Sequence, residues 1–142
     1  MTIGLSTTLR SNRLQVFLET VDHASDEYDS AHLFIYSGDR PVTGGAVDEY
    51  DNTLLLDFLF PFPCGSISNG ILTFGTIEDV YGLSAGVPSW ARIVDADENF
   101  VADLSVTNLI GNGDVKLDSL TLEIFVGGLV KCTVATMTEG NI

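Results

Sequence analysis

The sequence predicts a mostly β protein, an antiparallel β-sandwich or barrel of about seven strands that carries one N-terminal α-helix. Three observations predict this fold class. Apolar residues near the N-terminus recur at helical spacing. From residue 31 onward, short β-rich runs alternate with clusters of turn-forming residues. The 142-residue chain contains no fixed-period repeat and no linker-like segment, so we expect residues 1–142 to form a single domain.

The helix is predicted from one apolar stripe. The stripe consists of Leu14, Phe17, Leu18 and Val21, which fall at positions i, i+3, i+4 and i+7. Ser6 or Thr7 is placed to cap the first turn by accepting a free backbone N–H. We expect the helix to end near Val21, because the acidic stretch 23–30 contains few apolar residues and is typical of a solvated loop.

Seven segments have the composition of β-strands. They are residues 31–36, 54–60, 70–75, 90–95, 100–106, 117–126 and 130–137. In segment 100–106, alternation directs Phe100, Ala102, Leu104 and Val106 to the core and Val101, Asp103 and Ser105 to the exterior. In segment 117–126, it directs Leu120, Leu122, Ile124 and Val126 to the core.

The last two predicted strands form a hairpin around Gly127 and Gly128. A two-residue turn would place Lys131 opposite Ile124 and put a charge on the core face. A three-residue loop with a left-handed glycine shifts the register by one residue and avoids this. The resulting pairs are Val126–Val130, Ile124–Cys132 and Leu122–Val134. We therefore expect the three-residue loop.

The charge balance excludes two classes of partner. The chain has 20 Asp+Glu against 6 Lys+Arg, a formal net charge of −14 at pH 7. Phosphate backbones and anionic membrane surfaces repel such a chain, so we expect neither nucleic acid nor a membrane as a partner. The most apolar stretch, 54–63, is interrupted by Asp57, Pro61 and Pro63 and is too short to span a bilayer. No secretory signal pattern is visible, so we expect synthesis in the cytoplasm.

We expect no catalytic, cofactor-binding or metal-binding residues. The two histidines, His23 and His32, stand outside any nucleophile motif and are interpreted as structural. Residues 95–99, Asp-Ala-Asp-Glu-Asn, imitate the start of a calcium loop. Phe100 and Val106 occupy the positions that such a loop requires to be glycine and glutamate. The segment therefore predicts a hairpin turn.

The two cysteines, Cys64 and Cys132, form neither a CxxC pair nor a zinc spacing. A disulfide between them is not expected in a chain that stays in the cytoplasm. Cys132 lies in an alternating apolar run and is expected to be a small buried residue. Cys64 follows a Pro-Phe-Pro sequence and is expected at a strand exit.

The aromatic residues leave two interpretations open. A first group consists of Phe58, Phe60 and Phe62. These are expected in the core, and if exposed they would form an association patch. Trp90, the single tryptophan, is more typical of a core or interface position. Together with Tyr28 and Tyr50 it would alternatively supply a platform on which a sugar stacks.

Four stretches of the sequence occur in a distinctive order. They read STTLRSNRL at 6–14, LFIYSGDRPVTGG at 33–45, PSWARIVDAD at 88–97 and GDVKLD at 113–118. In this order they resemble a family of small, acidic virion structural proteins of tailed bacteriophages. The resemblance extends over residues 6–141. The chain departs from the family pattern in the aromatic-rich segment 58–62 and in the acidic stretch after the helix.

The resemblance implies a non-enzymatic capsid decoration protein, or cement protein, on the outer head surface of the virion. The implied partners are the major capsid protein and copies of the chain itself, in a homo-oligomer for which a trimer is expected. The family carries no catalytic residues that transfer to this sequence. Two alternatives remain open, a tail or tail-fibre component and a carbohydrate-binding or host-attachment module.

Overall fold

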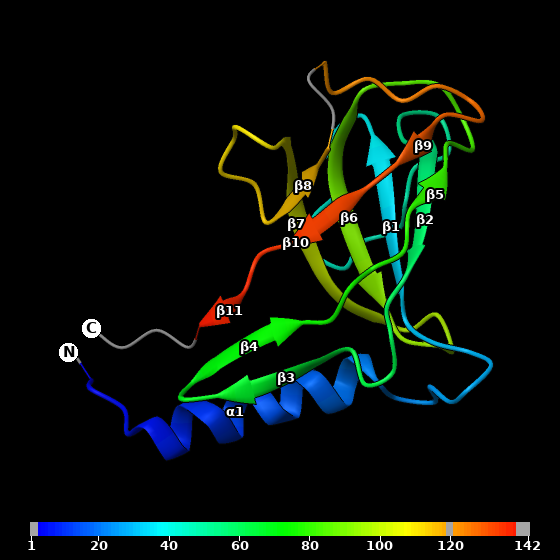
Figure 1. The fold of residues 1–142 in the computed structure, drawn as a ribbon. Coiled ribbons are helices and arrows are strands. Elements are labelled where there is room, and N and C mark those ends of the chain that lie inside the picture. The colour runs from blue at the N-terminus through cyan, green and yellow to red at the C-terminus, as the bar shows by residue number, and fades with distance from the viewer. Residues whose placement is uncertain (1–2, 119–120, 139–142) are drawn as a thin grey trace.

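Figure 1 shows the computed structural model, which describes residues 3–118 and 121–138. These residues form one helix, α1 (Thr7–Val21), and eleven strands. The strands are β1 (His32–Ser37), β2 (Leu54–Leu59), β3 (Gly65–Ser68), β4 (Ile71–Phe74), β5 (Val80–Tyr81), β6 (Pro88–Val94), β7 (Phe100–Asn108), β8 (Val115–Leu117), β9 (Leu129–Val130), β10 (Cys132–Val134) and β11 (Met137–Thr138).

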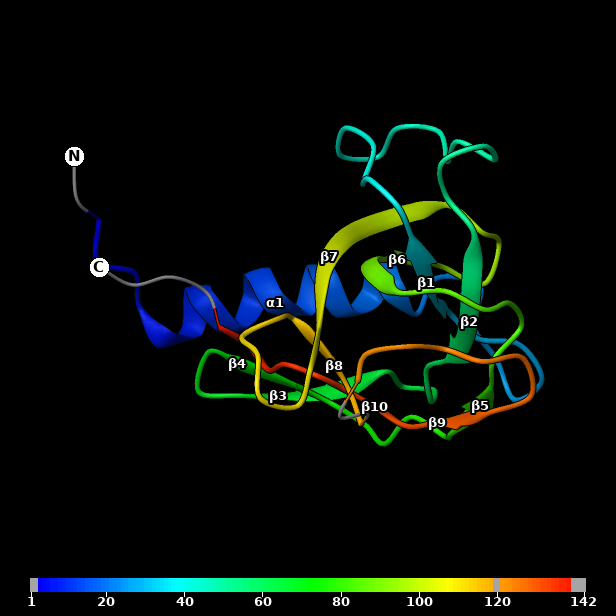
Figure 2. The same ribbon diagram turned by 90° about the horizontal axis from the view of Figure 1, so that it is seen from above.

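The strands are distributed over three sheets. The main sheet has six strands in the order β10-β8-β7-β6-β1-β2, and two small sheets have the orders β11-β4-β3 and β5-β9. The chain is therefore mostly β with one N-terminal helix, as predicted. It differs from a uniform set of seven antiparallel strands, because β7 and β8 pair in parallel and several strands have only two or three residues. Figures 1 and 2 show α1 alongside β3 and β4 at one end of the molecule, with β5 and β9 at the other end.

Helix α1 begins and ends where the sequence predicts. The Ser6 side chain caps it, because its Oγ accepts the backbone N–H of the third helical residue at 3.1 Å. Leu14 and Val21 are fully buried, and Phe17 and Leu18 pack against the core. The apolar stripe is thus the buried side of the helix. Among the described residues, no helix is both long and apolar enough to cross a membrane.

The core lies on the inner face of the main sheet. Its centre includes Leu33 and Ile35 of β1 and Ala91 and Ile93 of β6, all of them 0% exposed. Phe58 and Phe60 join this core, which confirms their predicted position. Phe62 is 55% exposed and does not. The aromatic run is therefore divided between the core and the surface.

Four of the predicted strands, 31–36, 54–60, 90–95 and 100–106, correspond to β1, β2, β6 and β7. The predicted strand 70–75 is β4, but β3 was not predicted. The two form a hairpin in which Ser68 pairs with Ile71, so Asn69 and Gly70 alone make the turn. Both turn residues have positive φ, 52° and 75°, as a type I′ turn requires. Asn-Gly is the favoured sequence for that turn, so a signal for β3 was present.

The predicted hairpin between segments 117–126 and 130–137 is wrong. Strand β8 ends at Leu117, and residues 121–128 contribute a single bridge, from Ile124 to Gly86. The observed pairs are Cys132–Leu117, Val134–Val115 and Val130–Val80. Segment 130–137 is broken among β9, β10 and β11, which belong to three different sheets. Of the four residues predicted to face inward from 117–126, Leu120 lies outside the described residues.

The physical reason is that apolar alternation identifies a buried face but not the neighbouring strand. Ile124 is buried as predicted, whereas Val126 is 70% exposed. Leu122 packs against the core but has a φ of 42°, which lies outside the strand region. Residues 121–126 therefore lie across the core as an irregular segment, and β10 pairs with β8 instead.

Alternation also changes at the start of β7. Val106 is buried as predicted, but Phe100 is 41% exposed and Val101, predicted to face outward, packs against the core. The register between β6 and β7 shifts between Ile93 and Val94. Such a bulge inserts one extra residue and reverses the facing of the residues before it.

We predict that Leu14→Ala lowers the free energy of unfolding by about 2–5 kcal/mol, because it leaves a cavity at a fully buried position. Val16 is 65% exposed on the same helix, so Val16→Ala is the matched control, with an expected change within about 0.5 kcal/mol. Urea unfolding followed by circular dichroism measures both. Equal effects of the two substitutions would contradict the packing described for α1.

Candidate functional site

The outer face of β1 and β6 carries a row of aromatic side chains. Its members are His32, Phe34, Tyr36 and Trp90. The rings of Tyr36 and Trp90 stack with their centroids 4.6 Å apart. The Arg92 guanidinium carbon lies 5.2 Å from the Trp90 ring centroid and 5.1 Å from that of Phe100, within the range of a cation–π contact.

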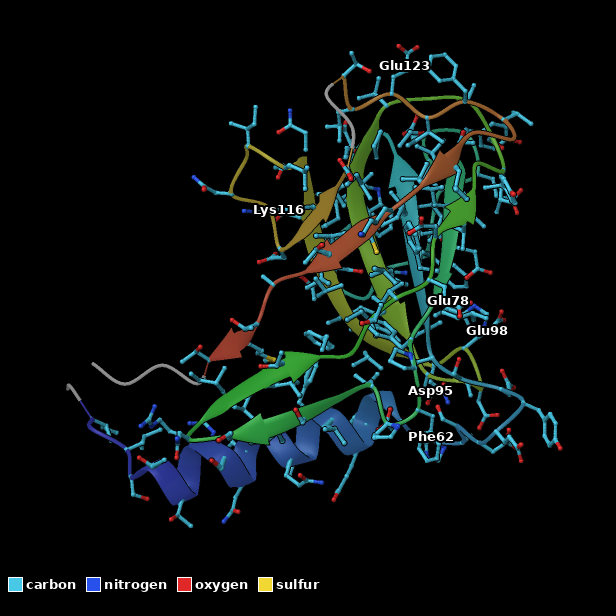
Figure 3. The ribbon with its side chains drawn as sticks, viewed as in Figure 1. Phe62, Glu78, Asp95, Glu98, Lys116 and Glu123 are labelled. Carbon is cyan, nitrogen blue, oxygen red and sulfur yellow. The ribbon has the colours of Figure 1, made fainter. Side chains whose placement is uncertain are left out.

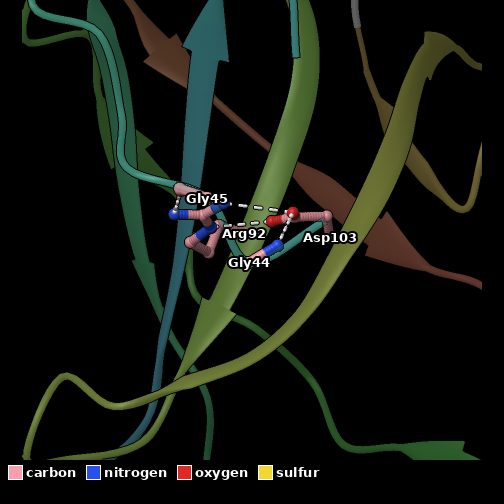
Figure 4. Close-up of polar contacts among 4 residues, drawn as sticks. All are labelled: Gly44, Gly45, Arg92 and Asp103. Atoms are coloured by element: carbon pink, nitrogen blue, oxygen red, sulfur yellow. Dashed lines mark hydrogen bonds and ion pairs between the residues drawn. The ribbon is translucent and has the colours of Figure 1, made fainter. Parts of the chain in front are cut away.

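Residues 38–53, which join β1 to β2, lie over this outer face (Figure 2). Arg92 and Asp103 form a bidentate ion pair, with Nε to Oδ1 at 2.7 Å and Nη2 to Oδ2 at 3.1 Å. Arg92 Nη1 also donates to the Gly45 carbonyl at 2.8 Å, and the Gly44 N–H donates to Asp103 Oδ2 at 3.0 Å (Figure 4). We call these four residues the Arg92–Asp103 clasp, because they hold the covering segment to the sheet.

The clasp is shielded from solvent. The side chain of Asp103 is 1% exposed and that of Arg92 is 9% exposed. Burial by itself raises the pKa of the Asp103 carboxyl group. The hydrogen bonds from Arg92 and the Gly44 N–H, together with the charges of Arg92 and Arg40, outweigh this effect and hold the pKa below its ordinary value. Asp103 is therefore ionised at neutral pH.

Trp90 is 2% exposed, so a buried position for it is confirmed. The sugar platform of Trp90, Tyr28 and Tyr50 does not form. Tyr28 and Tyr50 are 90% and 99% exposed, whereas the face of Trp90 is occupied by Tyr36 and Arg92. These three side chains therefore offer no common surface on which a sugar could stack.

A second feature is a cleft of about 670 Å³ on the side of the molecule where β2 forms the sheet edge. The acidic loop 26–30, the end of β2 with residues 60–62, and segment 76–80 form its walls. Six carboxylates line it, from Asp26, Glu27, Asp29, Asp57, Glu78 and Asp79. We call it the acidic cleft. Figure 3 labels Glu78 and Phe62 on this side of the molecule.

One histidine–aspartate pair lies in the acidic cleft. His32 Nδ1 and Asp57 Oδ1 are 2.7 Å apart, and both side chains are partly exposed. Among the described residues, no serine, threonine or cysteine side chain is hydrogen-bonded to His32. The pair therefore resembles the base and its orienting acid in a hydrolase, but in the described part of the chain no hydroxyl or thiol group is hydrogen-bonded to the base.

A third feature is a set of exposed apolar side chains on two neighbouring segments, 80–87 and 124–130. The backbone N–H of Gly82 donates to Gly128 O at 2.8 Å, and Tyr81 pairs with Leu129 across β5 and β9. The exposed side chains are Tyr81, Leu83, Val87, Phe125, Val126 and Leu129, each between 55% and 70% exposed. We call these six residues the apolar rim. No alternation in the sequence marks this rim, because β5 and β9 have two residues each.

The predicted hairpin turn at 95–99 is confirmed. The Asp95 carboxylate accepts the backbone N–H groups of Asp97 and Asn99 at 3.0 and 2.8 Å. Its oxygens are thus used within the turn. The other histidine, His23, lies 3.6 Å from Asp97 at the surface. Within residues 3–118 and 121–138, no group of three His, Cys, Asp or Glu side chains is placed to hold a metal ion.

Both cysteines are free and buried, in agreement with the prediction for Cys132. Burial is the main cause that raises the pKa of the Cys64 thiol to about 12, and the charge and hydrogen bond of Asp22 contribute to the same rise. Burial and the charge of Asp79 raise the pKa of Cys132 to about 12 as well. Since the thiolate is the reactive form, neither thiol is activated as a nucleophile at neutral pH.

No protein-family model, curated protein or solved structure matches this chain. Its function is therefore argued from the three features described above. The clasp is closed and buried, which is typical of a structural element. The apolar rim and the acidic cleft are open to solvent and therefore accessible to other molecules.

We predict that Asp103→Asn lowers the free energy of unfolding by about 3–5 kcal/mol at pH 7, because it leaves the Arg92 charge buried without its partner. The ionised Asp103 carboxylate contributes to the free energy of unfolding above its ordinary pKa of 3.8. This contribution is lost as the pH falls through the lower pKa that the group has in the folded protein. The difference in the free energy of unfolding between the parent protein and the Asp103→Asn variant, measured by urea unfolding, should therefore become smaller below about pH 4. Asp51→Asn, at an exposed position of the covering segment, is the control. A difference that is constant with pH would contradict the ionised clasp.

Proposed function

We propose that this chain is a non-enzymatic structural protein of a tailed-bacteriophage particle, a capsid decoration protein that binds the outer head surface and stabilises it. The observation that carries the proposal is the apolar rim. Isolated apolar residues are common on protein surfaces, but a group of six on two adjoining segments is typical of a contact surface. The order of the four sequence stretches described above supports the same proposal.

The rim is also held in a defined shape, which favours binding. The N–H of Gly82 donates to Gly128 O, and the N–H of Gly127 donates to Gly82 O, at 2.8 and 2.9 Å. Gly86 and Ile124 exchange two further hydrogen bonds. A surface that is already ordered loses less conformational entropy when it binds.

We assign the apolar rim to contacts between copies of the chain, in a homo-oligomer for which a trimer is expected. At a net charge of −14, copies repel one another. The chain has 6 Lys+Arg, one of which is held in the clasp, so ion pairs between copies are scarce. An apolar contact offsets the repulsion without basic residues.

The major capsid protein is the proposed second partner. The acidic surface is unsuited to nucleic acid, which agrees with a position outside a DNA-filled shell. A tail or tail-fibre component would use an apolar contact surface equally well. The two positions differ in copy number and location, so imaging separates them.

Cryo-electron microscopy of particles of the virus that carries this gene tests the proposal. We expect density for the chain on the outer face of the head, repeated with the capsid lattice. Particles that lack the chain should lose this density and release their DNA at a lower temperature. Density on the tail with none on the head would replace the decoration role with a tail role. Absence of the chain from purified particles would overturn the proposal.

We predict that self-association persists in 0.5 M NaCl, because salt screens the repulsion between acidic copies and does not weaken apolar contacts. Light scattering coupled to gel filtration measures the mass at 0.05 and 0.5 M NaCl. The double substitution Phe125→Ser with Val126→Ser should shift the protein to monomer. The matched control is Val42→Ser with Ile110→Ser, at positions 83% and 84% exposed outside the rim. Dissociation of the parent protein by salt, or an unchanged mass of the rim variant, would contradict this role of the rim.

A further inference from the structure

The acidic cleft combines a large volume with charge that the protein itself does not neutralise. Its volume of about 670 Å³ is in the range of ligand-binding sites. None of its lining residues is lysine or arginine, and His32 is the one side chain there that can carry a positive charge. The cleft therefore gathers six of the 20 acidic residues of the chain at one place.

Three of the six carboxylates have roles within the fold. Asp26 accepts the N–H groups of Tyr28 and Asp29 at 2.7 and 2.9 Å, and Asp29 in turn accepts the N–H of Ser30. Asp57 holds His32. These bonds engage the three carboxylates within the fold.

The other three carboxylates are Glu27, Glu78 and Asp79. All three are exposed, and none forms a hydrogen bond or an ion pair with another described residue. Like charges repel one another, and positive charge brought into the cleft would lower that repulsion. They are therefore free to bind a positively charged group from outside the chain.

Aromatic side chains at the cleft suit an organic cation. Tyr28 is 90% exposed, Phe62 is 55% exposed, and the buried Phe60 contributes to the lining. A guanidinium or ammonium group gains attraction from an aromatic face, and its alkyl stem packs against apolar surface. A small inorganic cation would gain little from these rings.

The carboxylates are also spread too widely for a metal ion. Within the described part of the chain, no three acidic, histidine or cysteine side chains converge as a metal requires. They come instead from three separate segments along the walls. Such a distribution matches a ligand that carries several positive charges along its length.

From this combination we propose that the acidic cleft binds an extended, arginine- or lysine-bearing segment of a partner protein. Arginine fits best, because its planar group binds a carboxylate through two hydrogen bonds and also stacks on an aromatic ring. The site adjoins the apolar rim, since segment 76–80 lines the cleft and residue 81 begins the rim. The inference concerns the isolated chain and does not depend on a place in the virion.

Calorimetric titration of the protein with the blocked peptide (Arg-Ala)3 in 50 mM NaCl tests the proposal. We expect saturable binding at one site, with no binding of (Gln-Ala)3. Glu78→Gln with Asp79→Asn should weaken binding about tenfold, because two surface charge pairs are lost. The matched control, Glu49→Gln with Asp51→Asn, removes the same charge from exposed positions outside the cleft and should change affinity by less than about twofold.

A third variant distinguishes specific contacts in the cleft from general electrostatic attraction to an acidic protein. Tyr28→Ser changes no charge, so it should weaken the arginine peptide severalfold only if the ring contacts the guanidinium group. Equal losses in the cleft and control variants, or no peptide binding, would overturn the proposal. Displacement of the peptide by one equivalent of Ca²⁺ at constant ionic strength would indicate a metal site instead. Since no particle is used, these outcomes are independent of the imaging test.

Discussion

The structure depends on one constraint, which is that the central strand β6 is buried on both faces, with β1 half-buried on its outer face beside it. Leu33 and Ile93 face the apolar core, whereas Trp90 and Arg92 face the opposite side and are also excluded from solvent. A sheet of this kind needs two covers. The first is the core itself, and the second is the segment that joins β1 to β2. That segment is largely polar, so burial of apolar surface does not hold it, and the ion pair between Arg92 and Asp103 does so instead.

The acidic cleft and the apolar rim, the two surfaces to which we assign binding, lie toward the edge of the main sheet that β2 forms. Segment 76–87 contributes first to the acidic cleft and then to the apolar rim, so two chemically different surfaces adjoin on one connection. The two proposed contacts are expected to respond to salt in opposite directions, because ionic strength screens the attraction between charges and does not weaken apolar association.

The elements that were predicted correctly from the sequence are those whose hydrophobic pattern continues over six or more residues. The stripe of α1 spans two helical turns, and strands β1, β2, β6 and β7 have at least six residues each. The errors arise where the signal is short or non-local. The apolar alternation around Cys132 is equally compatible with pairing to Leu117 and with pairing to Ile124. Periodicity therefore does not identify the partner strand. The candidate sites were harder to predict. Acidic residues are so frequent in the sequence that nothing indicated that Glu27 and Glu78 line the same cleft. Trp90 indicated a buried position but not which segment covers it.

The last ten described residues complete all three sheets. Strand β9 is one half of the β5-β9 sheet, β10 is the edge of the main sheet beside β8, and β11 is the edge beside β4. Each of these contacts joins residues that are distant in sequence. During synthesis, therefore, each of the three sheets lacks one strand until residues 129–138 have left the ribosome. Until then the nascent chain lacks the partners of β4, β5 and β8, and unpaired strand edges of this kind are able to pair with another chain.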